Sequence, residues 1–210
     1  MKKGYFVTIE GCEGVGKSTQ LNFLKEYLEK TGQEVYFTRE PGGVAISEEI
    51  RKVILNPSFT EMTDKTEMLL YASSRAQLMA EQIIPKLDEG VTVICDRFID
   101  SSYAYQGYAR GLGIDNVRKI NEYVVEGYMP DLTIFIDLSP DKSFRRKNSK
   151  VVLNDRLEKE DLSFHMKVYE GYKEAERISN GRIVSVVPCE DKMETFSKIL
   201  NVMREKGIIK

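Results

Sequence analysis

The chain has 210 residues, of which 41% are hydrophobic and 30% charged, a composition typical of one globular domain and not of a disordered chain. Its 31 Lys and Arg residues against 33 Asp and Glu residues give a net charge of −2, which argues against a general nucleic-acid-binding protein. Three widely spaced cysteines and one histidine exclude a zinc site, a disulfide framework and any mechanism with two histidines. No apolar run reaches the length of a membrane span, and the first residues lack the pattern of a signal peptide, so we expect a cytoplasmic protein without a membrane partner.

Short apolar runs and helical periodicity alternate along the chain. In chain order they predict a strand at 5–10, a helix from Lys17 to Gly32, a strand at 34–39, helices at 47–55 and 64–89, a strand at 91–96, a helix at 115–126, a strand at 132–138, a helix at 157–178, a strand at 182–187 and a helix at 193–206. We expect the long helix at 64–89 to bend or break near Pro85. The alternation predicts an α/β fold, a doubly wound five-stranded parallel sheet flanked by helices, in one domain over 1–210. Ligands then bind outside the carboxyl ends of the strands.

The strongest motif lies between the first strand and the first helix and matches the P-loop pattern G-x-x-x-x-G-K-[ST]. Its glycines let the backbone wrap around phosphate oxygens, and its N–H groups face the anion. Lys17 adds a charge near the β- and γ-phosphates, and the Ser18 hydroxyl can ligate Mg²⁺. The residues predicted to bind the nucleotide are Gly11, Cys12, Glu13, Gly14, Val15, Gly16, Lys17, Ser18 and Thr19.

A P-loop protein also needs an acidic residue at the end of a neighbouring strand. Asp96 and Asp137 both follow buried strands. We favour Asp96 as the second Mg²⁺-organising residue, because Arg97 follows it and places a phosphate-seeking cation at the same strand end. Asp137 is then a strand-end cap.

Further polar and aromatic residues point to a second substrate. Arg39, before Pro-Gly-Gly, suits a rigid turn that holds an anion, although Arg39 and Arg51 fit a surface turn and a solvated helix face equally well. Tyr71 and Arg75 share one helix face and suit a stacked base, but taken alone they fit a core tyrosine and a surface ion pair better. The polar and aromatic segment 96–107 follows a buried strand, which favours a functional loop.

In combination these motifs resemble the bacterial thymidylate kinases, which are P-loop nucleoside monophosphate kinases, over essentially the whole chain. The resemblance rests on the P-loop, on Thr-Arg-Glu-Pro-Gly-Gly at 38–43, on Asp-Arg-Phe at 96–98, on Ser-Ser-Tyr-Ala-Tyr-Gln-Gly at 101–107 and on Asp-Arg-Leu-Glu at 155–158. Phe98 departs from the tyrosine that is usual in the family and lacks its hydroxyl, while the preceding Asp96-Arg97 pair is intact.

The resemblance implies a transfer of phosphate from ATP to dTMP, giving ADP and dTDP, with Mg²⁺ as cofactor, in the synthesis of dTTP. Arg39 and Arg97 would hold the dTMP phosphate, with support from Arg51, while Asp96 would organise Mg²⁺ and Arg97. Because the acceptor phosphate has a second pKa near ~6, no general base is required. Catalysis then depends on positioning and on charge neutralisation by Lys17, Mg²⁺ and arginines.

The resemblance also implies contacts to the base and the sugar. Tyr71 would stack on thymine and Arg75 would donate to a thymine carbonyl. Gln106 would contact the base edge, with Ser102 nearby. Tyr105 would fill the space of a ribose 2′-hydroxyl and so favour deoxyribose.

Residues 142–150 hold five Lys and Arg residues and no acidic residue. Taken alone, they fit a solvated surface or a weak nucleic-acid patch; in the family such a segment, here about 142–156, is a lid that closes over ATP. The P-loop carries Glu13, which the resemblance places near the sugar 3′-hydroxyl, and no arginine. The lid would then supply the catalytic cation, and Arg145, Arg146 and Arg156 are the unranked candidates.

Two other functions compete with the monophosphate kinase. A deoxynucleoside kinase shares the P-loop and the lid, but it would need a general base and would lack two arginines for a monophosphate. The other is a P-loop switch or binding protein without kinase activity; a GTPase switch should carry a guanine motif N-K-x-D, which this sequence lacks. The family is typically homodimeric, so a homodimer that binds dTMP and ATP, without nucleic acid, is the expected assembly.

Overall fold

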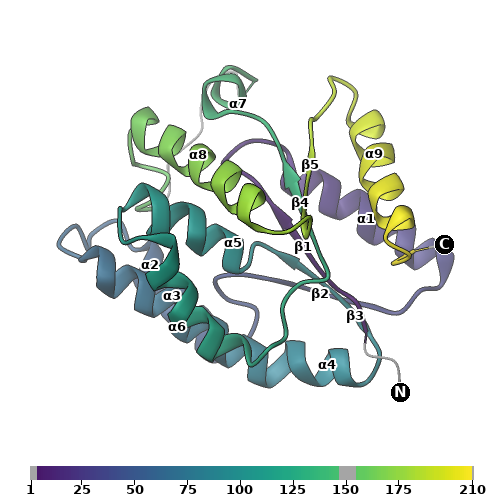
Figure 1. Ribbon diagram of the computed structural model, residues 1–210, viewed down its shortest axis with the longest axis horizontal. Helices are drawn as coiled ribbons and strands as arrows, with labels where there is room; N and C mark the ends of the chain where they lie inside the picture. Colours follow the sequence, from purple (N-terminus) through teal and green to yellow (C-terminus); the bar gives the residue numbers. More distant parts are fainter. Residues whose placement is uncertain (1–3, 147–154, 210) are drawn as a thin grey trace.

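The computed structural model describes residues 4–146 and 155–209, with the backbone alone at Arg145 and Arg146. Its sheet has five strands in the order β2-β3-β1-β4-β5, all parallel (Figure 1). The strands are β1 (Phe6–Glu10), β2 (Val35–Arg39), β3 (Thr92–Asp96), β4 (Leu132–Ile136) and β5 (Ile183–Val186). The predicted five-stranded parallel α/β fold is therefore confirmed.

The register of the strands gathers the site at one edge of the sheet. Arg39, the last residue of β2, lies opposite Asp96, the last residue of β3, and Ile9 of β1 lies opposite Asp96 from the other side. The loops that follow β1, β2 and β3 therefore leave the sheet side by side. This edge is the one at which parallel sheets bind ligands.

Helices cover both faces of the sheet (Figure 1). On one side α1 packs against α9, and on the other lie α8, the helices around it and the pair α2 and α3. The helical elements are α1 (Lys17–Thr31), α2 (Ala45–Leu55), α3 (Asp64–Leu78), the π-helical turn η1 (Met79–Ile83), α4 (Ile84–Asp88), α5 (Ile99–Ser102), the π-helical segment η2 (Tyr103–Ala109), α6 (Ile114–Val125), α7 (Pro140–Arg146), α8 (Leu162–Ile178) and α9 (Lys192–Glu205).

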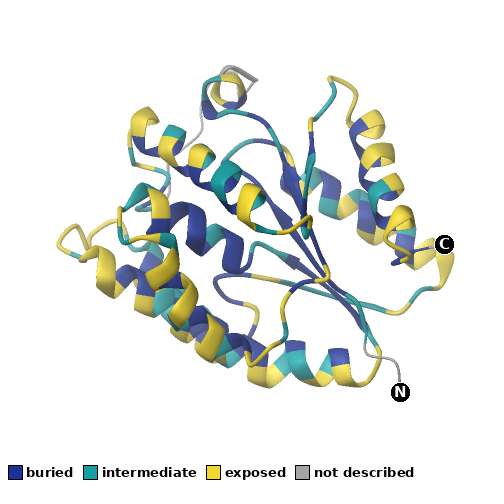
Figure 2. Ribbon diagram, in the orientation of Figure 1, coloured by how far each residue is buried: buried dark blue, intermediate teal, exposed yellow. Residues whose placement is uncertain are grey.

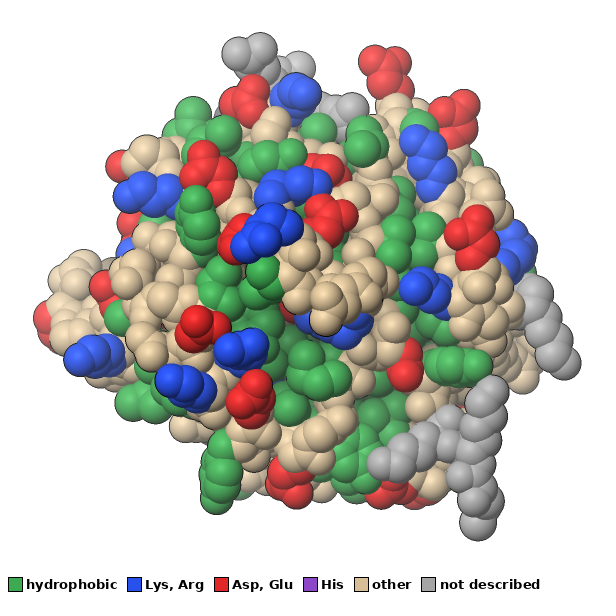
Figure 3. All heavy atoms as spheres, in the orientation of Figure 1, with side chains coloured by type: hydrophobic (Ala, Val, Ile, Leu, Met, Phe, Trp, Pro, Cys, Tyr) green, Lys and Arg blue, Asp and Glu red, His purple; other side chains and the backbone are tan. Residues whose placement is uncertain are grey.

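The core follows from strands that are apolar on both faces. Every residue of β1 and β4 is buried, whereas the edge strand β2 is only partly covered (Figure 2). Such continuous burial requires helices on both faces of a parallel sheet. On the face shown in Figure 3, Lys and Arg side chains are interspersed with Asp and Glu. Among the described residues, no helix is both long and apolar enough to cross a membrane.

The long helix at 64–89 is interrupted near Pro85, as expected. The interruption is the π-helical turn η1, where the N–H of Ile84 donates to the carbonyl of Met79, five residues back. Pro85 has no N–H, and its ring would clash with the carbonyl four residues earlier in a regular α-helix. The wider turn accommodates the proline without ending the helix, and α4 continues in the same path (Figure 1).

Some predicted boundaries are wrong. The helix expected from residue 157 begins at Leu162, because Asp161 caps it by accepting the N–H of Phe164 at 2.8 Å. Residues 155–160 instead form turns, in which Asp155 accepts the N–H of Glu158 at 2.8 Å. The strand expected to reach residue 138 ends at Ile136.

Candidate active site

The loop between β1 and α1 is shaped to wrap closely around an anion. Gly11, Gly14 and Gly16 have φ angles of 149°, 76° and 99°, which favour glycine. A Cβ on Gly11 would lie 3.0 Å from the carbonyl oxygen of Ile136, so a side chain there would crowd the sheet. Helix α1 begins directly after Gly16, at Lys17, and a helix N-terminus beside such a loop binds phosphate.

Lys17 brings a buried positive charge to this loop. Its Nζ donates to the carbonyl oxygens of Gly11 at 3.0 Å and Cys12 at 3.2 Å. Burial, followed by the nearby charge of Arg97, lowers the pKa of the Lys17 ammonium. A cation that is already desolvated interacts strongly with a phosphate, because little water has to be removed when the anion binds. The other motif side chains differ in exposure, with Cys12 and Val15 buried and Ser18 exposed.

A cavity of about 210 Å³ opens beside the P-loop and brings most of the predicted site residues together. The predicted residues in its lining are Glu13, Lys17, Ser18, Arg39, Arg51, Tyr71, Arg75, Asp96, Arg97, Tyr105 and Gln106. Other predicted and described site residues lie outside this lining, namely Gly11, Cys12, Gly14, Val15, Gly16 and Thr19 of the P-loop, together with Ser102 and Arg156. One cavity therefore combines phosphate-binding groups with groups that suit a base.

Asp96 and Ser18 offer oxygen atoms to a divalent cation. Asp96 Oδ1 is buried, and no donor among the described residues reaches it. A buried acceptor of this kind calls for a ligand or water. Ser18 and Asp96 line the same cavity, and carboxylate and hydroxyl oxygens suit Mg²⁺ that is otherwise held by phosphate and water. The described residues contain no cluster of three or more His, Cys, Asp or Glu residues that would form an all-protein metal site.

Asp137, the alternative acid, is already engaged by its neighbours. Its carboxylate accepts from the hydroxyl of Tyr169 at 2.8 Å and from Nζ of Lys173 at 3.1 Å. Both partners lie on α8, so Asp137 ties that helix to the end of β4. This structural role fits the preference for Asp96 as the metal-organising residue.

Arg97 is held in the cleft by a set of polar contacts. Its guanidinium pairs with the carboxylate of Glu13 and donates to the hydroxyls of Tyr172 at 2.8 Å and Ser101 at 3.3 Å. Its Cζ lies 5.5 Å from the centre of the Tyr105 ring. The φ angle of Arg97 is 67°, a strained conformation for a residue with a side chain. Such strain persists where the surroundings fix the residue, and it is concentrated at functional sites.

The residue that fixes the backbone around Arg97 is Glu10, which sequence reasoning missed. Its Oε1 accepts the N–H of Phe98 at 2.7 Å, and its Oε2 accepts the hydroxyls of Ser101 at 2.6 Å and Tyr172 at 2.9 Å. Burial, reinforced by the charge of Asp100, raises the pKa of Glu10 from 4.5 to about 7. An acidic residue at the end of an otherwise apolar strand was the available sequence signal.

The remaining two phosphate-binding candidates have carbonyl or carboxylate partners. Arg39 donates to both carboxylate oxygens of Glu48, at 2.8 and 3.1 Å, while its side chain stays 46% exposed. Arg51 donates to the carbonyl oxygen of Pro41 at 2.8 Å. Both arginines line the cavity. Arg39, Arg51 and Arg97 therefore border one space that could hold an anion.

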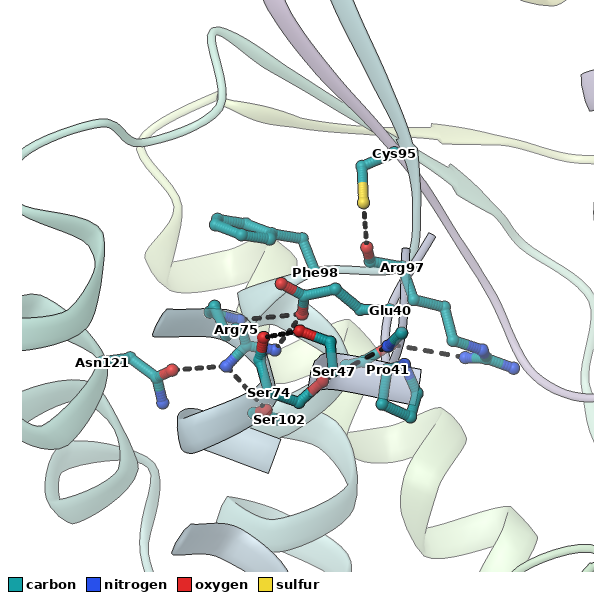
Figure 4. A network of polar contacts seen from close by, with 12 residues as sticks. Glu40, Pro41, Ser47, Ser74, Arg75, Cys95, Arg97, Phe98, Ser102 and Asn121 are labelled. Atoms are coloured by element: carbon teal, nitrogen blue, oxygen red, sulfur yellow. Dashed lines mark hydrogen bonds and ion pairs between the residues drawn. The ribbon is translucent and has the colours of Figure 1, made fainter. Parts of the chain in front are cut away.

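Arg75 is the most completely enclosed cation of the site (Figure 4). Its Nε and Nη2 donate to Glu40 Oε2 at 2.8 and 2.5 Å, and its Nη1 contacts Ser102 Oγ at 3.2 Å and Asn121 Oδ1. Its Cζ also lies 5.1 Å from the Phe98 ring centre. The guanidinium is therefore fixed in one orientation, and one N–H of Nη2 is not used by these contacts.

The two aromatic candidates flank this region. Tyr71 is half-buried in the cavity wall, and burial raises the pKa of its phenol. Tyr105 is buried and its hydroxyl lies 3.5 Å from Glu13 Oε1. Gln106 is 1% exposed and donates from Nε2 to Glu67 Oε1 at 2.8 Å. Glu67 was not among the predicted site residues.

The structure describes the candidate lid arginines only in part. The side chains of Arg145 and Arg146, and residues 147–154 between them and Asp155, lie outside the described residues. Arg156 is described: its Nη2 donates to Glu67 Oε2 at 2.5 Å and its Nε to the carbonyl of Ile54 at 3.2 Å. These contacts hold Arg156 against α2 and α3, away from the cavity lining.

Two further residues complete the cavity environment. The Phe98 ring is fully buried, with its centre 4.8 Å from that of Phe6, so the position that departs from the family packs in the core. His165 lines the cavity and is 2% exposed, yet neither ring nitrogen has a hydrogen-bond partner among the described residues. Burial lowers the pKa of this imidazole, so it is neutral at pH 7.

Comparisons with known proteins give a consistent result. A family model described as thymidylate kinase matches residues 9–199. A protein named thymidylate kinase from Clostridium novyi (strain NT) is 54% identical over 174 residues, which cover 82% of this chain and 84% of that protein. Another of that name, from Geobacillus sp. (strain WCH70), is 47% identical over 207 residues and covers 97% of this chain and 98% of its own length. A third, from Thermoanaerobacter sp. (strain X514), is 44% identical over 203 residues.

Proposed function

This chain belongs to the thymidylate kinase family, and on that premise we propose that it transfers the γ-phosphoryl group of ATP to dTMP in the P-loop cleft, with the products ADP and dTDP. The chain is thus an enzyme of nucleotide synthesis. One observation supports placing the reaction in this cleft. Lys17 and Arg97, whose charges suit phosphate, and Tyr71, whose aromatic ring suits a base, line the same cavity.

The chemistry asks the protein to bring two polyanions together. At neutral pH the acceptor phosphate is already largely a dianion, so no residue has to remove a proton. Lys17 binds the donor phosphates at the helix N-terminus, while Arg39, Arg51 and Arg97 bind the acceptor phosphate from the opposite side. These cations align the two phosphates and neutralise the charge that repels them.

The acceptor phosphate binds guanidinium groups that are paired with carboxylates in the structure. Glu13 pairs with Arg97 and Glu48 with Arg39, and three of these residues, Glu13, Arg39 and Arg97, line the cavity. A dianionic phosphate is a stronger bidentate partner for a guanidinium than either carboxylate. We therefore expect dTMP to displace these ion pairs and Glu13 to accept a hydroxyl of the sugar.

Ser18 and Asp96 are the residues that would hold Mg²⁺, and the unpaired Oδ1 of Asp96 is the observation that supports this. Bound Mg²⁺ supplies positive charge to the phosphate oxygens. The catalytic roles of Arg145 and Arg146 stay predictions, as do the lid at 142–156, the single-domain organisation, the homodimer and the cytoplasmic location. For Arg156, its pairing with Glu67 supports a role in positioning and not in contact with the phosphates.

Selectivity for the acceptor follows from its functional groups. Thymine differs from uracil by one methyl group, which a pocket recognises with only ~1–3 kcal/mol, so some turnover of dUMP is expected. Cytosine presents an amino group where thymine has a carbonyl, and Arg75 can only donate. We expect dCMP to be rejected more strongly than dUMP.

The test is ADP release with ATP and Mg²⁺, measured with dTMP, dUMP, dCMP, thymidine or no acceptor. Strong stimulation by dTMP, weaker stimulation by dUMP and little by the others is the expected result. Stimulation by thymidine alone would favour a deoxynucleoside kinase. ADP release at the same rate with and without an acceptor would favour a non-kinase P-loop protein. Lys17→Ala is the matched control for contaminating kinases, since it removes the P-loop charge.

A further inference from the structure

Glu67 of α3 is a fully buried carboxylate at the centre of a polar cluster. Its Oε1 accepts from Gln106 Nε2 at 2.8 Å and from Arg110 Nε at 3.4 Å. Its Oε2 accepts from Arg110 Nη2 at 3.2 Å and from Arg156 Nη2 at 2.5 Å. Two of these partners are cations, which balance the charge of the carboxylate; Gln106 is the neutral one, and it lines the cavity.

The contact with Gln106 decides which end of its amide faces the cavity. A carboxylate between two guanidinium groups can only accept hydrogen bonds, so it must meet the NH₂ end of the amide. Turning the amide over would place the Gln106 carbonyl oxygen against the Glu67 carboxylate, with two acceptors in contact. Because Gln106 is only 1% exposed, solvent does little to relieve that repulsion.

We propose that Glu67 is a specificity-determining positioning residue, which holds the Gln106 amide so that its Oε1 is presented to the base as an acceptor. Arg75 lines the same cavity, and one N–H of its Nη2 is not used by its contacts with Glu40, Ser102 and Asn121. Donor next to acceptor complements an edge that carries a carbonyl followed by a ring N–H, as in thymine and uracil. Cytosine carries an amino group followed by an unprotonated ring nitrogen, which is the opposite pattern. This role of Glu67 rests on the proposed function, and it identifies what selects thymine over cytosine in the acceptor.

The expected effect is on discrimination between bases. In Glu67→Gln, the amide that replaces the carboxylate can accept or donate, so Gln106 loses its fixed orientation. The ratio of kcat/KM for dTMP to that for dCMP should fall at least about tenfold. A site built to hydrogen-bond one base selects strongly against a base that leaves the polar groups of the site unpaired. If Glu67 had only a structural role, the substitution would lower kcat/KM for dTMP and for dCMP together and leave their ratio unchanged.

Glu160→Gln is the matched control. Glu160 also pairs with Arg110, at 2.6 Å, but no contact joins it to Gln106. This variant should keep the wild-type ratio. A second comparison uses Gln106→Ala as background, where adding Glu67→Gln should leave the ratio unchanged, because the effect passes through Gln106. If Glu67→Gln does not fold, Glu67→Asp keeps the charge for both arginines and withdraws the carboxylate from Gln106.

The outcomes distinguish failure of the proposed function from failure of the proposed role of Glu67. A wild-type protein that does not phosphorylate dTMP would overturn the proposed function itself. A selective wild-type protein whose Glu67 variants keep the ratio of the Glu160→Gln control would overturn the role of Glu67 alone. A fall in the ratio that persists in the Gln106→Ala background would also overturn it, because Glu67 would then act by another route.

Discussion

Replacing Glu10 by Gln tests whether a buried carboxylate holds the loop that carries Arg97. The substitution keeps the size of the side chain and an acceptor for the N–H of Phe98, now 2.7 Å from Glu10 Oε1. The hydroxyls of Ser101 and Tyr172, which donate to Oε2, can rotate to accept from the new amide. The principal change is the loss of a titratable group.

The magnitude follows from the pKa of Glu10, which burial raises from 4.5 to about 7. The folded protein therefore binds the proton more tightly than the unfolded chain. Glu10 contributes stability that is fully present below pH 4.5 and is lost as the pH rises through 7. Since each pH unit between the two values is worth about 1.4 kcal/mol, the total is about 3 kcal/mol.

The assay is urea unfolding of both proteins from pH 5 to pH 9. Over this range the free energy of unfolding of the wild type should fall by about 2.5 kcal/mol more than that of Glu10→Gln. Other titrating groups are common to both proteins and cancel in the comparison. Parallel pH profiles would refute the reasoning, because they would mean that Glu10 titrates alike in the folded and unfolded protein.

Three further predictions concern other buried ionisable groups. The chain has a single histidine, so NMR titration of its ring protons reports on His165 directly; burial should hold its pKa below 6.5, and a value at or above 6.5 would contradict this. Lys17→Met should keep the fold but lower the rate of ADP release at least about 100-fold, and a rate near that of the wild type would exclude Lys17 from catalysis. Arg182→Ala leaves buried Asp100 without the guanidinium that now lies 2.6 Å from it, which should cost about 3–5 kcal/mol in urea unfolding. Arg177→Ala, at an exposed ion pair, is the control and should change stability little; equal effects of the two variants would show that burial does not matter here.

Features that depend on neighbours in the sequence were predictable. The P-loop is one continuous segment, and the alternation of apolar strands with amphipathic helices determined the parallel sheet that the structure confirms. Asp96 and Arg39 could be assigned to one edge because the strands of a parallel sheet end together. The resemblance to the thymidylate kinases, drawn from short motifs, agrees with the family match over residues 9–199.

Features that depend on partners far along the chain were not predictable. Arg156 was a candidate for the catalytic cation of the lid, yet its guanidinium donates to Glu67, 89 residues earlier, and it lies outside the cavity lining. Glu10 is the last residue of a strand, and its position in the sequence indicates only a polar strand end. In the structure its carboxylate accepts a hydrogen bond from the hydroxyl of Tyr172, 162 residues later.

The sequence by itself thus determined the fold, the phosphate-binding loop and the family, because these rest on local patterns that folding preserves. Only the tertiary structure decided which polar groups of the site are paired and which are free, such as Asp96 Oδ1. The physical reason is that a buried polar group must find its partner wherever the packing of helices and strands brings one within about 3 Å. That partner is set by the whole fold, and no local pattern of residues records it.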